Sequence, residues 1–267
     1  MPTTVADLRA AKQQGRRFVM LTAYDYPTAR LLTEAGVSVL LIGDSLGDNV
    51  LGHANTLPVG MQDMLHHARA VARGAPDALL IGDMPFGSYH VSAEQTIEHA
   101  IEFLKAGMHA VKLEGGGWVV ETVARLTERG IPVMGHLGLT PQSVNAFGGM
   151  RVQARSEESQ QRLRADAKAL ETAGAFALVL EGIPREVARR VTESLSIPTI
   201  GIGAGPDCDA QVLIIYDLVG ISEHTRGAVP KFARAYSDVG DRIVSAARAF
   251  VDDVREGRFP DDAHSYH

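Results

Sequence analysis

The stretch VSVLLIGD, residues 37–44, decides the fold, and a close copy of it returns as ALLIGD at residues 78–83. Each copy is an apolar run with the length of a buried strand, and each ends in Gly-Asp. Core packing gives no reason for a carboxylate at that point. If the runs are successive strands of a parallel sheet, Asp44 and Asp83 face each other at its carboxyl edge, where α/β proteins place their chemistry. The pair predicts a site for a hard divalent cation.

Apolar runs like these alternate with helical patterns along the whole chain. The runs cover residues 18–22, 37–42, 78–81, 110–113, 132–135, 176–180 and 198–202, with an eighth at 212–215 or 218–221. The helical patterns cover residues 27–35, 61–73, 93–106, 118–129, 157–173 and 185–194. Several of the helices end at a glycine that precedes the next strand, which is the usual chemistry of a helix C-cap.

This alternation predicts an α/β fold, a (β/α)8 TIM barrel that forms a single domain over residues 1–267. The segment 231–256 reads as helices packed outside the barrel, followed by a polar tail. An open doubly wound sheet fits the first five strand–helix units equally well.

Composition limits the class of protein. The chain has 267 residues, 45% of them apolar, and a formal net charge of -6 without a basic stripe, which argues against a nucleic-acid partner. Cys208 is the only cysteine, so an intrachain disulfide is impossible. Neither a signal peptide nor a membrane-spanning run is evident, so we expect a cytoplasmic protein without a membrane partner.

Polar or ionisable side chains follow nearly every predicted strand. They are Tyr24 and Asp25, Asp44 and Ser45, Asp83, Lys112 and Glu114, His136, Glu181, and the glycine-rich segment 201–205. Burying several charges together is costly unless they bind something, so this convergence indicates an active site. The alternative is a ring of rim salt bridges, such as Lys112 with Glu114.

Three of these residues, Asp44, Asp83 and Glu114, offer the oxygen ligands that Mg²⁺ prefers. Open metal positions beside Lys112 suggest an anionic, chelating substrate such as a 2-oxo acid. Lys112 would pair with its carboxylate, and Ser45 could add hydrogen bonds.

Glu181 ends an apolar run and suits a general base, although it could instead cap the following helix. The segment 201–205 is interpreted as a tight turn rather than a dinucleotide-binding loop, because it follows the seventh predicted strand instead of the first.

Several motifs together resemble those of the ketopantoate hydroxymethyltransferase family, over nearly the whole chain. They are TAYD (22–25), GDSLG (43–47), GDMPF (82–86), VKLEGG (111–116), GHLGLTPQ (135–142) and IGIGAG (200–205). The resemblance implies a (β/α)8 barrel related to the phosphoenolpyruvate mutase and isocitrate lyase barrels. It implies transfer of a hydroxymethyl group from 5,10-methylenetetrahydrofolate to 3-methyl-2-oxobutanoate, with Mg²⁺ stabilising an enolate, in pantothenate biosynthesis. It also implies a homo-oligomer, a decamer of paired pentamers.

The resemblance also implies roles for particular residues. Asp44 and Asp83 match the Mg²⁺ ligands, and Glu114 matches a metal-site residue that acts through water. The oxo-acid contacts match Asp44, Ser45, Asp83 and Lys112, and the proton acceptor matches Glu181. His136 lies near the site without an assigned role. The segment 222–229 and Gly182 depart from the family pattern.

Two other functions stay open. One is a carbon–carbon lyase or mutase of the same barrel superfamily, although Cys208 does not stand in the Lys-Lys-Cys-Gly-His-type motif of those lyases. The other is an oxo-acid-binding barrel that has lost catalysis.

Overall fold

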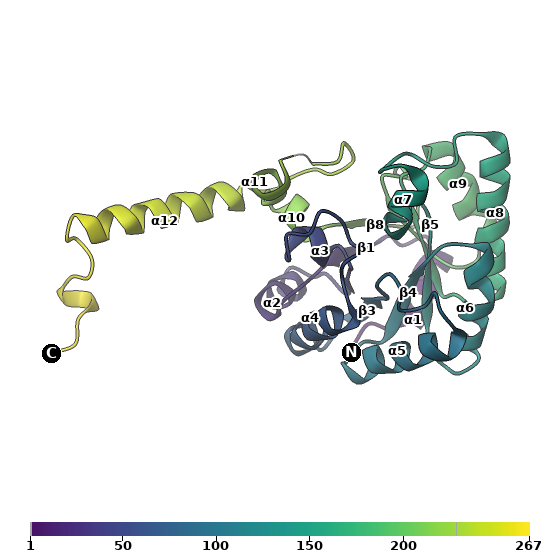
Figure 1. Cartoon of the computed structure of the whole chain (residues 1–267), viewed down its shortest axis with the longest axis horizontal. Coiled ribbons are helices and arrows are strands. Elements are labelled where there is room, and N and C mark those ends of the chain that lie inside the picture. The colour runs from purple at the N-terminus through teal and green to yellow at the C-terminus, as the bar shows by residue number, and fades with distance from the viewer. Residues whose placement is uncertain (1, 228) are drawn as a thin grey trace. The chain divides into compact units, whose positions relative to one another are not determined.

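Eight parallel strands close into a barrel in the computed structural model, which describes residues 2–227 and 229–267. The strands are β1 (Phe18–Thr22), β2 (Val39–Ile42), β3 (Leu79–Asp83), β4 (Ala110–Glu114), β5 (Val133–Gly138), β6 (Ala177–Glu181), β7 (Thr199–Ile202) and β8 (Ala210–Leu213). They pair in sequence order, and β8 closes the barrel against β1. The predicted TIM barrel is confirmed, and the open sheet is wrong (Figure 1).

Helices surround these strands (Figure 1). They are α1 (Val5–Gln13), α2 (Tyr26–Glu34), α3 (Leu46–Asn49), α4 (Met61–Gly74), α5 (Ala93–Lys105), α6 (Val120–Thr127), α7 (Val144–Phe147), α8 (Glu157–Thr172) and α9 (Arg185–Ser194), with 3₁₀ turns η1 (Gly117–Val119) and η2 (Pro141–Ser143). Side chains cap several starts, as when Asp25 accepts from the Thr28 N–H at α2. Gly36 and Gly174 follow α2 and α8 with φ of 87° and 95°, which confirms the predicted glycine ends.

The eighth strand differs most from the prediction. β8 begins two residues before the first predicted alternative, and the second alternative is wrong because α10 (Ile215–Leu218) occupies its start. Gln211 in β8 is exposed, so this strand lacks the continuous apolar run of its neighbours. Residues 203–209, between β7 and β8, form a turn without a helix, which supports the interpretation of the glycine-rich segment as a turn.

The barrel interior holds the main core. Met20, Val39, Ile81, Met134 and Ile200 are each fully buried and belong to one cluster. At the amino ends of the strands, the α1 side chain Leu8 joins this cluster, with Val5 and Phe18 packed against it. Burying a leucine side chain contributes about 1.5–3 kcal/mol, so α1 stabilises this end of the barrel.

Glycine is required in β3 by close packing rather than by backbone conformation. A Cβ on Gly82 would lie 2.4 Å from the ring of Phe103 in α5. The equivalent Gly43, in the first copy of the repeated motif, would bring a Cβ to 2.7 Å from the Ser45 hydroxyl. The glycine of the repeated motif therefore packs close to an aromatic ring in the second copy and close to a small polar side chain in the first.

The chain divides into two compact units, one through Ile214 and one from Ile215. The second unit contains α10, α11 (Ser222–Arg226), α12 (Val239–Arg255) and η3 (Asp262–His264). Of the described residues of α12, Gly240 alone is buried. Residues 222–226 of the divergent segment are helical, and Ala228 lies outside the described residues. The packing of the carboxyl-terminal helices outside the barrel stays a prediction.

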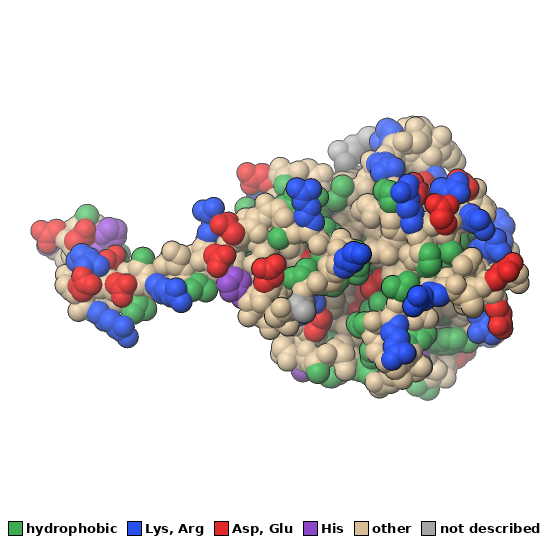
Figure 2. All heavy atoms as spheres, turned by 90° about the horizontal axis from the view of Figure 1, so that it is seen from above, with side chains coloured by type: hydrophobic (Ala, Val, Ile, Leu, Met, Phe, Trp, Pro, Cys, Tyr) green, Lys and Arg blue, Asp and Glu red, His purple; other side chains and the backbone are tan. Residues whose placement is uncertain are grey.

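No helix in the described part of the chain is both long enough and apolar enough to span a bilayer. On the face shown in Figure 2, lysine and arginine side chains are interspersed with aspartates and glutamates.

Candidate active site

Five neighbouring strands, β2 to β6, bring the predicted residues together, and Asp44 and Ser45 directly follow β2. Asp83 ends β3 and lies opposite Lys112, Glu114 ends β4 and lies opposite His136, and Glu181 ends β6. Lys112 and Glu114 are two residues apart on one strand, so their side chains point to the same side of the sheet.

Burial of these charges is nearly complete. Asp44, Asp83, Lys112 and Glu114 are each 2–3% exposed. The Glu181 side chain is 15% exposed. Charges this deeply buried need partners, which the strand ends supply to one another.

Lys112 links the carboxylates of the predicted metal site. Its Nζ donates to Asp83 Oδ1 at 2.6 Å and lies 3.6 Å from Glu114 Oε1. The Asp44 N–H donates to the other oxygen of Asp83 at 3.2 Å. The salt bridge between Lys112 and Glu114, the alternative interpretation of these residues, is therefore also present.

The electrostatics of this group follow from burial and from mutual charge. Burial, and then the nearby Asp83 and Glu114, raise the pKa of Asp44 well above its usual value. Burial opposes the charge of Lys112, but the three carboxylates outweigh it and raise the lysine pKa. The group thus places three acidic groups around one ammonium, and the raised pKa of Asp44 reflects a negative charge that lacks a compensating cation.

His136 lies between two glutamates. Its Nδ1 is 3.2 Å from Glu114 Oε1, and its Nε2 is 3.3 Å from Glu181 Oε2. Burial and Lys112 lower the pKa of His136, but Glu114 and Glu181 outweigh them and raise it to about 9. The imidazolium therefore connects the predicted metal site with the predicted base.

Glu181 does not cap the next helix. It is the last residue of β6, and α9 has Pro184 as its N-cap, without a side-chain capping bond. The capping interpretation of Glu181 is wrong. Ser45 lies directly after Asp44, with its hydroxyl 2.9 Å from the Tyr24 hydroxyl.

Gln142 and Tyr89 are site residues to which the sequence assigned no role. The Gln142 side chain donates to Asp44 Oδ2 at 2.9 Å, and its backbone N–H donates to Glu114 Oε2 at 3.0 Å. The Tyr89 hydroxyl donates to Gln142 Oε1 at 2.6 Å. Gln142 ends the GHLGLTPQ motif, so a buried polar residue inside a specific motif was the available signal.

The residues fit a magnesium ion that is completed by other ligands. No group of three His, Cys, Asp or Glu among the described residues is arranged to hold a metal. Mg²⁺, however, is usually bound through one or two carboxylates together with water and substrate oxygens. Asp44 and Asp83 provide such a pair, and the buried Glu114 Oε1, although ion-paired with Lys112 and His136, accepts no well-aligned hydrogen bond from the described residues. The donor set suits this ion.

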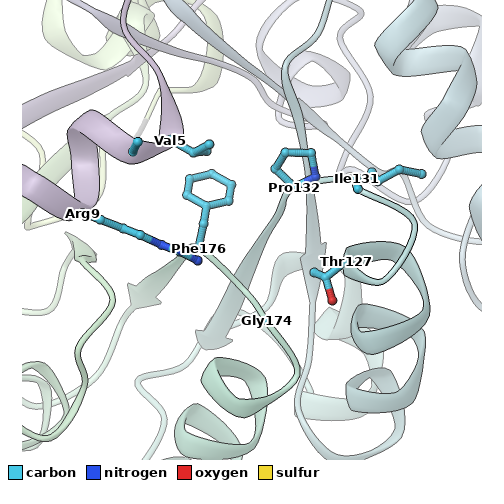
Figure 3. Close-up of a pocket in the computed structure, with 9 residues that line it drawn as sticks. Val5, Arg9, Thr127, Ile131, Pro132, Gly174 and Phe176 are labelled. Atoms are coloured by element: carbon cyan, nitrogen blue, oxygen red, sulfur yellow. The ribbon is translucent and has the colours of Figure 1, made fainter.

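A cavity of about 290 Å³ lies at the amino ends of the strands. Figure 3 shows Val5, Ile131, Pro132 and Phe176 around it, with Arg9 and Thr127 as its polar side chains. It shares none of the residues at the carboxyl rim and lacks their convergent charges.

Fold and candidate site together define the class: a (β/α)8 barrel with buried charged residues at the carboxyl ends of its strands, where enzymes of this fold carry their chemistry. Two solved structures have this fold. A phosphonopyruvate hydrolase in complex with oxalate and Mg²⁺ gives a TM-score of 0.63 at 18% identity, covering 98% of this chain and 91% of that one. A 2,3-dimethylmalate lyase of the PEP mutase/isocitrate lyase superfamily gives 0.61 at 20% identity, covering 96% and 99%.

The chain belongs to the ketopantoate hydroxymethyltransferase family, whose model matches residues 2–262. It is 52% identical to the 3-methyl-2-oxobutanoate hydroxymethyltransferase of Syntrophus aciditrophicus (strain SB), covering 98% of this chain and 96% of that protein. It is also 52% identical to that of Escherichia coli O157:H7 (strain EC4115 / EHEC), covering 100% and 99%. The protein is therefore a hydroxymethyltransferase of pantothenate biosynthesis that acts on small molecules.

Proposed function

We propose that the chain transfers a hydroxymethyl group from 5,10-methylenetetrahydrofolate to 3-methyl-2-oxobutanoate. With one water consumed, the products are 2-dehydropantoate and tetrahydrofolate. The observation that carries the proposal is the buried group of Asp44, Asp83, Lys112 and Glu114, connected through His136 to Glu181. A barrel that only bound an oxo acid would not need Glu181, which lies outside the predicted metal site and contacts it through His136.

Asp44 and Asp83 are the residues that would hold Mg²⁺, with Glu114 acting through water. When bound, the ion would withdraw electrons from the 2-oxo group and so acidify the adjacent C3–H.

Lys112 would neutralise the substrate carboxylate. Its raised pKa keeps it protonated at physiological pH, and its ammonium lies 2.6 Å from Asp83. Ser45, next to Asp44 on the rim, would contribute a hydrogen bond to the same substrate. A 2-oxo acid would thus meet a cation at its carboxylate and a metal at its chelating oxygens.

Glu181 would accept the C3 proton, which leaves a carbon nucleophile to attack the one-carbon unit of the folate. His136, whose Nε2 is 3.3 Å from Glu181 Oε2, would hold this carboxylate in place. A base needs a fixed position and access to the substrate, and the Glu181 side chain is held beside His136 and is 15% exposed.

The proposal also includes a homo-oligomer, a decamer. On α12 the apolar residues Ile243, Phe250 and Val254 are spaced along one face and are 58%, 56% and 49% exposed. An exposed apolar stripe of this kind usually marks an interface. Light scattering of the purified chain would test the expected mass of ten copies. The cytoplasmic location stays a prediction.

Exchange of the C3 proton with solvent tests the base. Glu181→Gln should slow this exchange by about 10²–10⁴-fold, because it removes the proton acceptor while keeping the shape of the side chain. Binding of 3-methyl-2-oxobutanoate should be nearly intact. Glu186→Gln, an exposed glutamate in the first turn of α9, is the matched control and should exchange like the wild type. Undiminished exchange in Glu181→Gln would overturn the assignment.

A further inference from the structure

A cavity of about 570 Å³ adjoins the candidate active site, between the turn after β4 and the amino-terminal half of α8. This volume is within the range of small-molecule and cofactor sites. Its inner wall includes Gly115, which follows Glu114 in the chain, and Gly138, which lies opposite Glu181 in the sheet. The cavity therefore begins where the metal-site glutamate and the base end their strands.

Its wall is tied directly to the segment that carries the base. The Gln153 N–H donates to the Gly182 carbonyl at 2.8 Å, and both Gln153 and Ala154 line the cavity. Ala154 has a φ of 53°, a left-handed conformation that is costly for alanine, and its side chain is buried. Strain of this kind persists where surrounding contacts hold the backbone, often at ligand sites.

Asp166, on α8, offers the cavity a carboxylate with one oxygen held in place. Oδ1 accepts from the Gly117 N–H at 3.1 Å, whereas Oδ2 accepts no hydrogen bond from any residue that the structure describes. A Cβ on Gly116 would lie 2.4 Å from Oδ2, so glycine is needed for the carboxylate to reach this position. A fixed carboxylate in a cavity suits a ligand that presents two adjacent N–H donors.

The cavity also offers contacts to an aromatic ring and to an anionic group of a ligand. Trp118 lines the cavity and is 56% exposed, and its ring is parallel to that of Tyr89 within 3° at a centroid distance of 5.8 Å. The exposed Arg162, one turn before Asp166 on α8, also lines the cavity. An aromatic face, a carboxylate and a guanidinium thus lie along one cavity, whose lining includes Gly138, the sheet partner of Glu181.

We propose that this cavity binds the reduced folate cosubstrate. The N3–H and 2-amino groups of the pterin would pair with Asp166, the ring system would lie against Trp118, and Arg162 would attract the glutamate tail. This arrangement would bring the one-carbon unit of the donor to the carbon from which Glu181 removes the proton. The inference rests on the proposed function, since it assigns the donor of that reaction to a place.

Tetrahydrofolate alone is the probe for binding. Trp118 is the chain's single tryptophan, so tetrahydrofolate should quench the intrinsic fluorescence, after correction with free N-acetyltryptophanamide for absorption. Asp166→Asn keeps an acceptor for Gly117 but replaces the second oxygen with a donor. It should weaken tetrahydrofolate binding in equilibrium dialysis by about tenfold or more and raise the KM for 5,10-methylenetetrahydrofolate by a similar factor.

Two arginines on α8 test the proposed contact between Arg162 and the glutamate tail of the folate. Arg162 lines the cavity and Arg164 does not, although both are exposed. Arg162→Gln should weaken binding about threefold, an effect that salt reduces, and Arg164→Gln should leave it unchanged.

Exchange of the C3 proton needs no folate and separates the two proposals. It should stay within about twofold of the wild type in Asp166→Asn, which also verifies the fold of the variant. Unchanged tetrahydrofolate affinity in Asp166→Asn, equal effects of the two arginine variants, or a wild type that does not bind tetrahydrofolate would each overturn the folate site. A wild type that binds tetrahydrofolate but does not exchange the C3 proton would instead overturn the proposed function.

Discussion

The two ends of the barrel are built from the same eight strands but carry opposite kinds of side chain. At the amino end, Leu8 packs with Phe18 and Phe176 in an apolar cluster. At the carboxyl end, Asp44 and Lys112 belong to a group of buried charges in which burial raises the pKa of the aspartate. One end of the barrel therefore stabilises the fold, whereas the other holds the buried charges of the proposed site, whose burial is unfavourable for folding.

Asp44→Asn should have the largest effect, at the carboxyl end. Removing a proposed metal ligand should lower the rate of hydroxymethyl transfer by about 10³-fold, which is about 4 kcal/mol of barrier. A group with a raised pKa stabilises the fold at pH values below its ordinary pKa, and this contribution disappears as the pH rises through the raised value. The metal-free variant should therefore be more stable than the metal-free wild type at pH 7.

Thermal unfolding with and without Mg²⁺ is the measurement. Saturating Mg²⁺ should raise the Tm of the wild type and hardly affect Asp44→Asn, because a ligand stabilises only the state that binds it. Equal Mg²⁺-induced shifts of the Tm in the two proteins would contradict the proposal that the carboxyl end binds the metal through Asp44.

Leu8→Ala should have the next largest effect, at the amino end. Removing most of a side chain that is 2% exposed should lower the free energy of unfolding by about 2–5 kcal/mol, through lost burial and a cavity. The kcat of the folded enzyme should not change. Denaturant unfolding measures the loss, and Leu31→Ala, at a leucine that is 66% exposed, should cost less than about 0.5 kcal/mol. A fall in kcat with Leu8→Ala would show that the two ends are coupled.

The smallest expected effect concerns a carboxylate at the amino end. Although burial opposes it, hydrogen bonds from Lys168 and Ser196 lower the pKa of Glu171 to about 2. Its contribution to stability is therefore complete above its ordinary pKa and is lost as the pH falls toward 2. Glu171→Gln should cost about 1 kcal/mol at pH 7 and progressively less below pH 4.5.

Urea unfolding at several pH values checks this. Glu193→Gln, at an exposed glutamate on α9, serves as the control and should show a small effect throughout. A difference between wild type and Glu171→Gln that does not shrink in acid would contradict the assigned pKa.

Seven of the eight strands were predictable because a parallel strand covered on both faces needs a continuous apolar run. β8 was not, because Gln211 interrupts the apolar pattern and its pairing with β1 comes from closure of the barrel. The charged site residues could be located as well, because they lie at or just after the ends of these apolar runs. Gln142 and Tyr89 come from connections, where the distance of 53 residues between them says nothing about their contact.

The repeated Leu-Ile-Gly-Asp of β2 and β3 has a consequence for how this sequence can drift. An alanine at position 82 must displace the buried ring of Phe103, whereas at position 43 it needs only the Ser45 hydroxyl to turn away from Tyr24. The first change strains the scaffold, and the second disturbs one hydrogen bond beside the site. The glycines of the two identical motifs thus face different packing constraints, and Gly43 tolerates a side chain more easily than Gly82.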